Sequence, residues 1–259
     1  MCRTGVREDK SYQNIQITPS GYHGEPIYSL QLHNDVMRDL QAELKLGDYV
    51  YDRIDIAIDD HNYSFTERYK LNRLVNLLIS VKFKLKNCYE SRNPLTLEWL
   101  SICAKNDRLQ IENYNKALQS CFEDVAYNRV ELRESRLARR KKRLEIYQVF
   151  DRWIERLKNC IDCYDLLQEQ ANDHLVFQFH KELVSGRVKS ENEFIRKYQE
   201  NVFKGTQLTD FFIRLGHSKR QAAAKATNFA RDNRIEYIKK YELREYIDEL
   251  VQAMKIYYT

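Results

Sequence analysis

The chain has 259 residues, of which 43% are hydrophobic and 31% are charged, and its formal net charge is +5 at pH 7. This balance excludes a disordered chain, which has too few apolar residues to form a core, and no apolar run approaches the roughly 20 residues that a membrane-spanning helix needs. The modest positive charge permits a polyanionic partner such as DNA but does not require one.

The amino-terminal end and the cysteines indicate the compartment. Residues 1–9 are rich in charge and have no apolar segment, so we expect no secretory signal. Six cysteines in a chain of this length then indicate reduced thiols rather than disulfides. Cys160 and Cys163 form a CxxC pair, but no second pair is spaced to complete a four-ligand zinc site. We therefore expect a cytoplasmic protein with no membrane partner.

The first predicted elements follow a loop-rich stretch at residues 11–26. Alternation of apolar and polar residues over 27–32 predicts a strand. Helical spacing of apolar residues over 35–46 then predicts a helix, which Gly47 ends.

Residues 51–59 alternate more clearly than any other stretch, and they predict a strand with three isoleucines on one face. The other face carries Arg53, Asp55, Ala57 and Asp59. Aspartate is disfavoured in strands, so two aspartates on one strand face need a reason. Either this face is solvated, or the carboxylates hold a hard cation such as Mg²⁺ or Mn²⁺.

Ser64 and Glu67 form a capping box that predicts a helix packed on a sheet. Residues 81–86 then alternate apolar side chains with three lysines, which predicts a strand with a basic open face. Such lysines commonly protect an edge strand from pairing, and the alternative is a row that follows a phosphate backbone. The three lysines are Lys82, Lys84 and Lys86.

A candidate nucleophile lies in the stretch 109–116. If this stretch is a strand, Glu112, Tyr114 and Lys116 point the same way. A phenol flanked by a carboxylate and an ammonium can act as a nucleophile, although a tyrosine that only packs a half-buried sheet has the same pattern. Residues 127–133 predict a further strand. Its charged face carries Tyr127, Arg129, Glu131 and Arg133.

The densest basic cluster in the chain follows this strand. We expect a helix to begin near Ser135, and its first turns carry the cluster. Such a run is usually a solvated helix surface, but its position after a candidate site strand makes contact with a DNA backbone an equal alternative. The cations are Arg136, Arg139, Arg140, Lys141, Lys142 and Arg143.

Three short motifs in this order resemble the Rep_trans family of rolling-circle replication initiators, which plasmids and conjugative transposons encode. The resemblance covers roughly residues 25–145. The motifs are Arg53-Ile-Asp55-Ile-Ala57-Ile-Asp59, Tyr114-Asn115-Lys116 and Arg129-Val130-Glu131. The chain departs from the family pattern at Cys103, which replaces a turn glycine, at Glu112, which stands where a cation is common, and at Asn113.

The resemblance implies an α+β catalytic domain over residues 1–145, with an antiparallel sheet of the saddle topology of the TATA-binding protein, packed by helices. It implies that the protein is a homodimer whose DNA partners are a double-stranded replication origin and the nicked single strand. A host helicase is a further candidate partner. The basic residues expected to contact DNA in this domain are Arg129, Arg133, Arg136, Arg139, Arg140, Lys141 and Lys142.

The resemblance also implies the chemistry, which is metal-dependent nicking and closing of DNA. Tyr114 would attack the scissile phosphate, leaving a 3′-hydroxyl primer and a 5′-phosphotyrosyl link to the protein. Asp55, Glu131 and Asp59 would hold Mg²⁺ or Mn²⁺, which polarises the phosphate. An unperturbed phenol has a pKa of about 10, and Lys116 is the nearest candidate cation to activate it.

Two other functions remain open at this point. Cys103 and Glu112 favour a DNA-binding regulator of the same family that has lost the nicking step. A metal-dependent nuclease that cuts through activated water would keep its activity without Tyr114.

Residues 146–259 are predicted to form a helical region, with a break at Ser185-Gly186 and a final amphipathic helix over 237–258. Within it, a short helix over 208–215, a glycine turn and a helix capped by Ser218 suit a helix-turn-helix that binds the origin or forms the dimer. An ordinary helical hairpin has the same signature. In the DNA-binding reading, the second helix presents Lys219 and Arg220 at its start.

Overall fold

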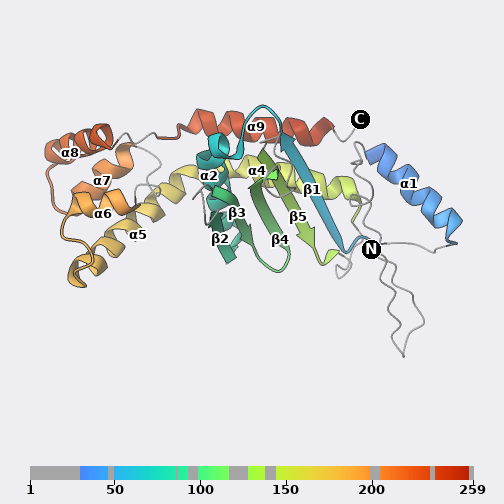
Figure 1. Ribbon diagram of the computed structural model, residues 1–259, viewed down its shortest axis with the longest axis horizontal. Coiled ribbons are helices and arrows are strands. Elements are labelled where there is room, and N and C mark those ends of the chain that lie inside the picture. Colours follow the sequence, from blue (N-terminus) through green and yellow to red (C-terminus); the bar gives the residue numbers. More distant parts are fainter. Residues whose placement is uncertain are drawn as a thin grey trace, which may run out of the picture.

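A computed structural model describes residues 30–45, 50–85, 87–92, 99–116, 128–137, 144–198, 205–233 and 237–256. The predicted α+β class is confirmed, because a five-stranded antiparallel sheet is packed by helices and followed by a helical carboxy-terminal region (Figure 1). In chain order the elements are α1 (Leu30–Glu43), β1 (Arg53–Asp60), α2 (Phe65–Phe83), β2 (Asn87–Arg92), β3 (Trp99–Lys105), β4 (Leu109–Asn115), β5 (Asn128–Ser135), α4 (Ile146–Asp162), α5 (Tyr164–Val184), α6 (Glu191–Tyr198), α7 (Gly205–Arg214), α8 (Lys219–Asp232) and α9 (Lys240–Ile256).

The strand order in the sheet is β1-β5-β4-β3-β2, and every neighbouring pair is antiparallel. Successive strands β2 to β5 therefore lie side by side, while α2 separates β1 from β2 in the chain. β1 joins the sheet beside β5, so the predicted aspartate strand and the predicted Arg-Val-Glu strand are direct neighbours. Both predicted strands are confirmed, as is the tyrosine strand β4.

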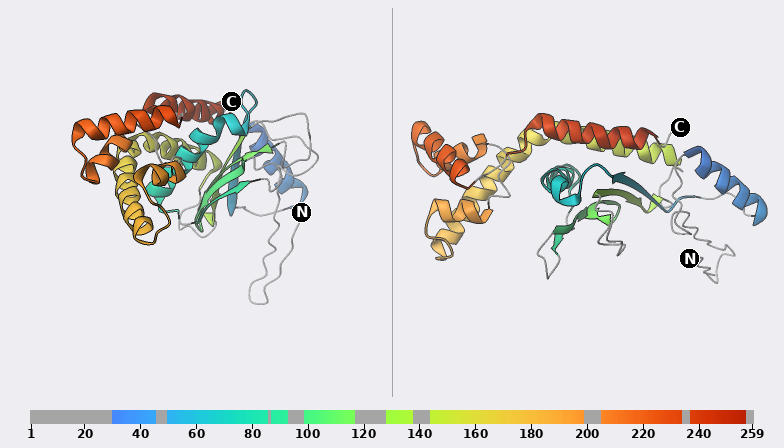
Figure 2. Two further views of the ribbon diagram at one scale, coloured as in Figure 1. Left: turned by 60° about the vertical axis from the view of Figure 1, so that its left-hand side comes forward. Right: turned by 45° about the horizontal axis from the view of Figure 1, so that its top comes forward.

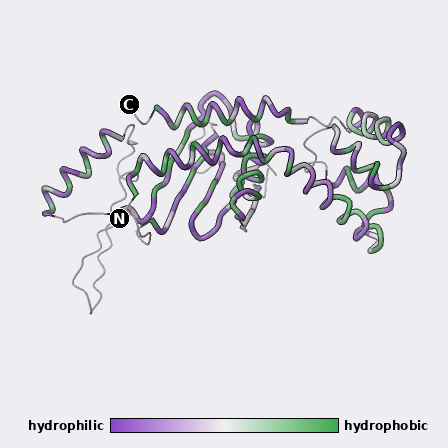
Figure 3. The backbone as a smooth tube through the Cα atoms, turned by 180° about the vertical axis from the view of Figure 1, so that it is seen from behind, coloured by the Kyte–Doolittle hydropathy of each residue, from purple (hydrophilic) through white to green (hydrophobic). Residues whose placement is uncertain are grey.

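The two faces of the sheet differ in what covers them. Helices α2, α4 and α9 lie on one face (Figure 2), which we call the covered face. The apolar residues of the alternating strands lie on this face. Figure 3 shows hydrophobic and hydrophilic residues following one another along the backbone of the strands. These buried residues include Ile54, Ile56, Ile58, Ile111, Val130 and Leu132. The opposite face, which we call the open face, carries the polar residues of the same strands.

Glu134 is a charged exception on the covered face, where its side chain is 0% exposed. Its carboxylate accepts an ion pair from each of two arginines of α4, Arg152 at 3.1 Å and Arg156 at 2.9 Å. A buried carboxylate without such partners would be strongly destabilising. The pair of arginines therefore fixes α4 against β5.

Helix α2 begins at the predicted capping box of Ser64 and Glu67, which is confirmed. The strand predicted over 81–86 is wrong in the part that the structure describes, because α2 continues to Phe83 and Lys84 caps it. Val81 lies three residues beyond Leu78 and extends the apolar stripe of the helix against the core. Continuing an existing helix adds one hydrogen bond for each residue fixed, which favours helix over a short new strand.

The strand predicted over 27–32 is also wrong from Leu30 onward, where α1 begins; residues 27–29 lie outside the described ranges. The helix predicted over 35–46 is confirmed as far as Glu43. Met37 is buried and Leu32 is 47% exposed, so the inward face follows helical spacing and the apparent alternation was accidental.

The helix predicted from Ser135 is wrong at its start, because β5 runs to Ser135 and residue 136 has a left-handed backbone with φ of 59°. Residues 138–143 lie outside the described ranges, and α4 begins at Ile146. Farther on, the predicted break at 185–186, the glycine turn at Gly216 and the cap at Ser218 are confirmed. The last predicted helix is confirmed as α9.

Two large hydrophobic cores and one small cluster, formed by Phe65, Tyr69 and Ile102, organise the described part of the chain. The core beneath the sheet includes Trp153 and Leu157 of α4 and Leu250 of α9, which all lie beyond residue 145. The second core is formed by α5, α6, α7 and α8. Its aromatic residues are Phe179, Phe194, Phe211, Phe212 and Phe229. Helices α4 and α9, which come before and after the helices of the second core in the chain, both pack on the sheet. The division of the chain at residue 145 stays a prediction.

The left-handed residue that caps α2 gives a stability test. Lys84 has φ of 53°, a conformation that costs a residue with a Cβ more than it costs glycine. We expect Lys84→Gly to raise the free energy of unfolding by about 0.5 to 1 kcal/mol in urea denaturation. Lys82→Gly, in the last turn of the same helix, should lower it by about 1 kcal/mol. Equal destabilisation by both changes would contradict the described end of α2.

Candidate functional site

The open face brings predicted site residues from three strands into three cross-strand rows. Asp59, Arg129 and Tyr114 form the first row, on β1, β5 and β4. The second row pairs Ala57, Glu131 and Glu112, and the third pairs Asp55, Arg133 and Gln110. The alternation of each strand, joined by the antiparallel register, therefore places these groups within reach of one another.

Arg129 and Asp59 form a two-point ion pair at one end of the site. The guanidinium donates from Nε to Oδ1 at 2.5 Å and from a terminal nitrogen to Oδ2 at 2.6 Å. Both side chains are partly buried, which reduces screening by water. The hydrogen bond with Asp59 raises the pKa of Arg129 further, so this cation is fixed and permanently charged.

Tyr114 lies beside this pair and is only 7% exposed. Its hydroxyl donates a hydrogen bond to Oε2 of Glu131 at 3.1 Å. The pKa of Tyr114 is raised from 10.0 to about 12. Burial is the largest cause and the charge of Glu131 acts in the same direction, while a hydrogen bond from Arg129 acts in the opposite direction. The phenol is therefore neutral at physiological pH, with a carboxylate in place to accept its proton.

Arg133 links the second and third rows. Its nitrogens donate to Oδ1 of Asp55 at 3.0 Å, to Oε1 of Glu131 at 2.6 Å and to Oε1 of Gln110 at 2.9 Å. Asp55 also accepts two hydrogen bonds from Nε of Arg53, and a terminal nitrogen of Arg53 forms an ion pair with the same carboxylate. Asp55 and Glu131 thus hold Arg133 against the face of the sheet.

Glu112 and Gln110 are parts of the site whose roles the motifs did not indicate. Glu112 stands directly opposite Glu131. The pKa of Glu112 is raised, and burial is the largest cause and the negative charge of Glu131 the second. Nε2 of Gln110 donates to Oε2 of Glu112 at 2.8 Å. The period of two from Tyr114 was the signal that could have found Gln110, since residues 110, 112 and 114 share one strand face.

The expected metal ligands Asp55, Glu131 and Asp59 do not fit a shared Mg²⁺ or Mn²⁺ ion in this arrangement. The carboxylates of Asp55 and Asp59 are both occupied by arginines. In the part of the chain that the structure describes, no three His, Cys, Asp or Glu side chains form a group that could hold a metal ion. A metal shared by these carboxylates would require Arg129 and Arg133 to move away first.

The remaining predicted residues are placed as follows. Lys116 comes after β4 has ended at Asn115, so strand alternation does not extend to it. Arg136 pairs with Asp107 at 3.0 Å, and both side chains are exposed. Lys219 and Arg220 are exposed at the start of α8. Four predicted DNA contacts lie outside the described ranges, namely Arg139, Arg140, Lys141 and Lys142.

The neighbours of Tyr114 act on its pKa in opposite directions, which can be measured. We expect Glu131→Gln to lower the pKa of Tyr114 from about 12 toward 10.0, because a negative charge is removed. Arg129→Met should raise the pKa, because a stabilising donor to the phenolate is removed. The measurement is a ¹⁹F NMR titration with 3-fluorotyrosine at position 114 alone, since its more acidic phenol titrates at a lower pH.

Glu90→Gln is the matched control for this titration, because Glu90 is a carboxylate of the same sheet that bonds Arg73 and the hydroxyl of Tyr69 instead. It should leave the midpoint unchanged. A shift in the same direction for Glu131→Gln and Arg129→Met would show that the described contacts do not govern the phenol.

Comparisons of the chain with protein-family models, with curated proteins and with solved structures found no match. Among the helices within the described ranges, none has an apolar stretch long enough to cross a bilayer. The functional argument is therefore carried by the three rows of the open face.

Proposed function

We propose that the protein nicks and rejoins one strand of DNA through Tyr114, as an initiator of rolling-circle replication does at a double-stranded origin. One observation carries the proposal. The Tyr114 hydroxyl lies between a carboxylate that accepts its hydrogen bond, Glu131, and a fixed guanidinium that can bind a phosphate, Arg129. A nucleophile held by a base and beside a cation is the arrangement that phosphoryl transfer to a side chain needs.

The proposed step can be written with these residues alone. The phenol oxygen of Tyr114 forms a bond to phosphorus while its proton passes to Glu131. The bond from phosphorus to the 3′ oxygen breaks, and that oxygen takes up a proton from solvent to become the primer hydroxyl. The 5′ phosphate remains on Tyr114, and the reverse reaction rejoins the strand.

Arg129 and Arg133 would bind the phosphate oxygens in this reaction. A guanidinium binds phosphate through two parallel hydrogen bonds, as it binds a carboxylate. Asp59 and Asp55 hold these arginines in place until a phosphate competes for them. The raised pKa of Tyr114 keeps the phenol protonated without DNA, so proton transfer to Glu131 accompanies the attack.

A second function is favoured by one observation. Tyr114 is 7% exposed, and both arginines are bonded to aspartates, so a scissile phosphate reaches the phenol only if these contacts open. A protein that binds DNA through this fold without cutting it would need no such opening. We therefore keep a DNA-binding regulator as the alternative.

The proposal includes the finer expectations from the resemblance. The sheet is then a saddle like that of the TATA-binding protein, and the protein acts as a cytoplasmic homodimer on duplex origin DNA, with a host helicase. Mg²⁺ or Mn²⁺ would bind the carboxylates only after Arg129 and Arg133 have moved away from them. Duplex binding is assigned to α8, where Lys219 and Arg220 are exposed and have no ion pair within the described residues. Exposed cations of this kind contact the phosphate oxygens of the DNA backbone.

The nicking reaction is tested with supercoiled plasmid that carries the DNA flanking the protein's own gene. We expect the wild type to relax this DNA and to form a covalent protein-DNA adduct, and Tyr114→Phe to lose both by at least about 100-fold. Tyr89→Phe is the matched control, because Tyr89 lies on the same face of the sheet, opposite Cys103, and should keep both activities.

Each arm of this assay decides between functions. Reactions contain Mg²⁺, Mn²⁺ or a chelator, which shows whether a metal is needed. An adduct that persists in Tyr114→Phe would refute the assigned nucleophile. Cleavage without an adduct would indicate a hydrolytic nuclease, and binding without cleavage would indicate the regulator.

Duplex binding by α8 is tested separately. We expect Lys219→Gln combined with Arg220→Gln to weaken duplex binding and to reduce the slope of log affinity against log salt by about two, because each cation releases about one counterion. Lys225→Gln is the control on the same helix, since its ammonium is already paired with Glu191 at 2.6 Å. An equal loss in both variants would contradict the assignment of this surface.

A further inference from the structure

Polar residues are buried directly behind the proposed site. Three strands each carry a site residue on the open face and, next to it in sequence, a polar residue on the covered face. The pairs are Asp59 with Asp60 on β1, Tyr114 with Asn113 on β4, and Arg129 with Asn128 on β5. Asn113 and Asn128 are fully buried.

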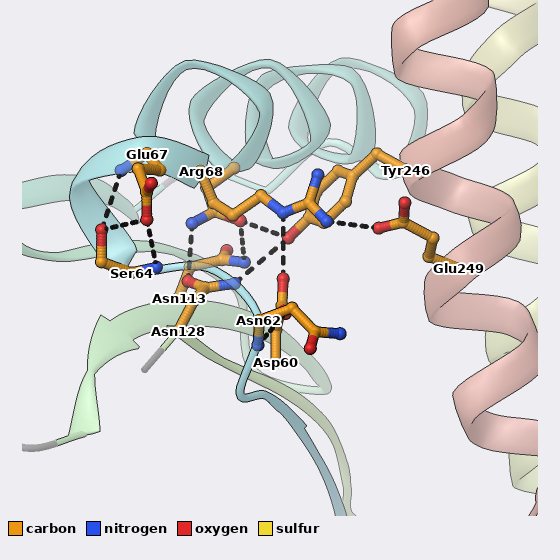
Figure 4. Close-up of polar contacts among 10 residues, drawn as sticks. Asp60, Asn62, Ser64, Glu67, Arg68, Asn113, Asn128, Tyr246 and Glu249 are labelled. Atoms are coloured by element: carbon orange, nitrogen blue, oxygen red, sulfur yellow. Dashed lines mark hydrogen bonds and ion pairs between the residues drawn. The ribbon is translucent and has the colours of Figure 1, made fainter. Parts of the chain in front are cut away.

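Asn72 of α2 joins two of these strands to the last helix through its hydrogen bonds. Its partners Asn113, Asn128 and Tyr246 are labelled in Figure 4. Its Nδ2 donates to Oδ1 of Asn128 at 2.8 Å. Its Oδ1 accepts from Nδ2 of Asn113 at 2.9 Å and from the hydroxyl of Tyr246 on α9 at 2.5 Å. Nδ2 of Asn128 also donates to the hydroxyl of Tyr246 at 3.4 Å. Nδ2 of Asn76, also on α2, donates to Oδ1 of Asn113. Five residues from four elements therefore share one buried hydrogen-bond network.

Arg68 extends this network to the third strand. It donates from Nε to Asp60 at the end of β1 at 2.9 Å, and it pairs with Glu249 of α9 at 2.5 Å. Its guanidinium lies 3.9 Å from the ring centre of Tyr63 and 4.8 Å from that of Tyr246. Arg68 and Asn72 thus connect β1, β4 and β5 to α9 from one side of α2.

We propose that this network, formed by Asp60, Arg68, Asn72, Asn76, Asn113, Asn128 and Tyr246, positions the catalytic row on the other face of the sheet. Adjacent residues of a strand move together, so a hydrogen bond that fixes Asn113 or Asn128 also fixes Tyr114 or Arg129. Buried amides tolerate few alternatives, because a shift would leave a donor or acceptor unpaired. The network members are positioning residues, and this role rests on the proposed function of Tyr114.

The network also makes the site depend on the last helix of the chain. Tyr246 and Glu249 lie on α9, which follows α6, α7 and α8. The hydroxyl of Tyr246 bonds both Asn72 and Asn128. Correct geometry at Tyr114 therefore requires α9 to be docked, which links the helical region to the chemistry of the sheet.

Tyr246→Phe tests the proposal by removing a single oxygen from the network. Asn72→Leu, which has a similar volume, is the second variant. Val251→Ala is the matched control, because Val251 is buried on the same helix but lies in the apolar core. Each variant carries 3-fluorotyrosine at position 114, so that ¹⁹F NMR reports the surroundings of the phenol without relying on DNA cleavage.

We expect both network variants to lower the titration midpoint of the phenol by about half a unit or more, because burial, the main cause of its high pKa, is relaxed. The rate of adduct formation at saturating DNA should fall about tenfold, with half-saturating DNA changed less than about twofold. Val251→Ala should lower the melting temperature at least as much and leave both readouts near wild type.

The outcomes separate this inference from the proposed function. An unchanged midpoint in Tyr246→Phe and Asn72→Leu overturns the positioning role, as does an equal shift in Val251→Ala. If the wild type forms no adduct, the proposed nicking function fails, and the fluorine titration still decides whether the network positions Tyr114. If Asn72→Leu does not fold, Tyr246→Phe alone decides the same question.

Discussion

Asn72 must satisfy its amide in a region from which water is excluded, and this requirement brings α2, β4, β5 and α9 to one point. Apolar contacts alone would hold the helices on the sheet, but such contacts are not directional and tolerate small sliding movements. Hydrogen bonds between buried amides are directional, so they select one register among several that would bury similar apolar area. The row next to this network on the open face, Asp59, Tyr114 and Arg129, takes its position from that selection.

Charged side chains on the open face remain in partial contact with water, unlike the buried amides of the covered face. Arg129 and Arg133 are each held by carboxylates in partly buried ion pairs, whose net contribution to stability is small because the cost of desolvation offsets much of the Coulomb attraction. Their value lies in orientation, since a guanidinium that is already held in place loses less side-chain entropy when it binds a phosphate. A face that is stable without ligand can therefore still be prepared to bind an anion.

The sequence predicted the elements whose signals are local and strong. The isoleucine alternation at residues 51–59, the capping box at Ser64, the helix cap at Ser218 and the Tyr114 strand all have such signals, and all are confirmed. The alternation at residues 81–86 predicted a strand, but its three apolar residues also suit the end of a helix, and α2 continues to Phe83. The network around Asn72 could not be predicted, because asparagines in a helical pattern are typical of a solvated surface, and the partners of Asn72 lie 41, 56 and 174 residues away. Likewise, the motifs indicated Asp55 and Asp59 as metal ligands, whereas the register places each opposite an arginine.

The helices α6, α7 and α8 form their own aromatic core between α5 and α9, and the structure places α4 and α9 together over the sheet (Figure 1). The chain therefore leaves the sheet layer once and returns to it once, as it would around an inserted module. Substitutions at the exposed Lys219 and Arg220 of α8 therefore remove no hydrogen bond of the polar network beneath Tyr114.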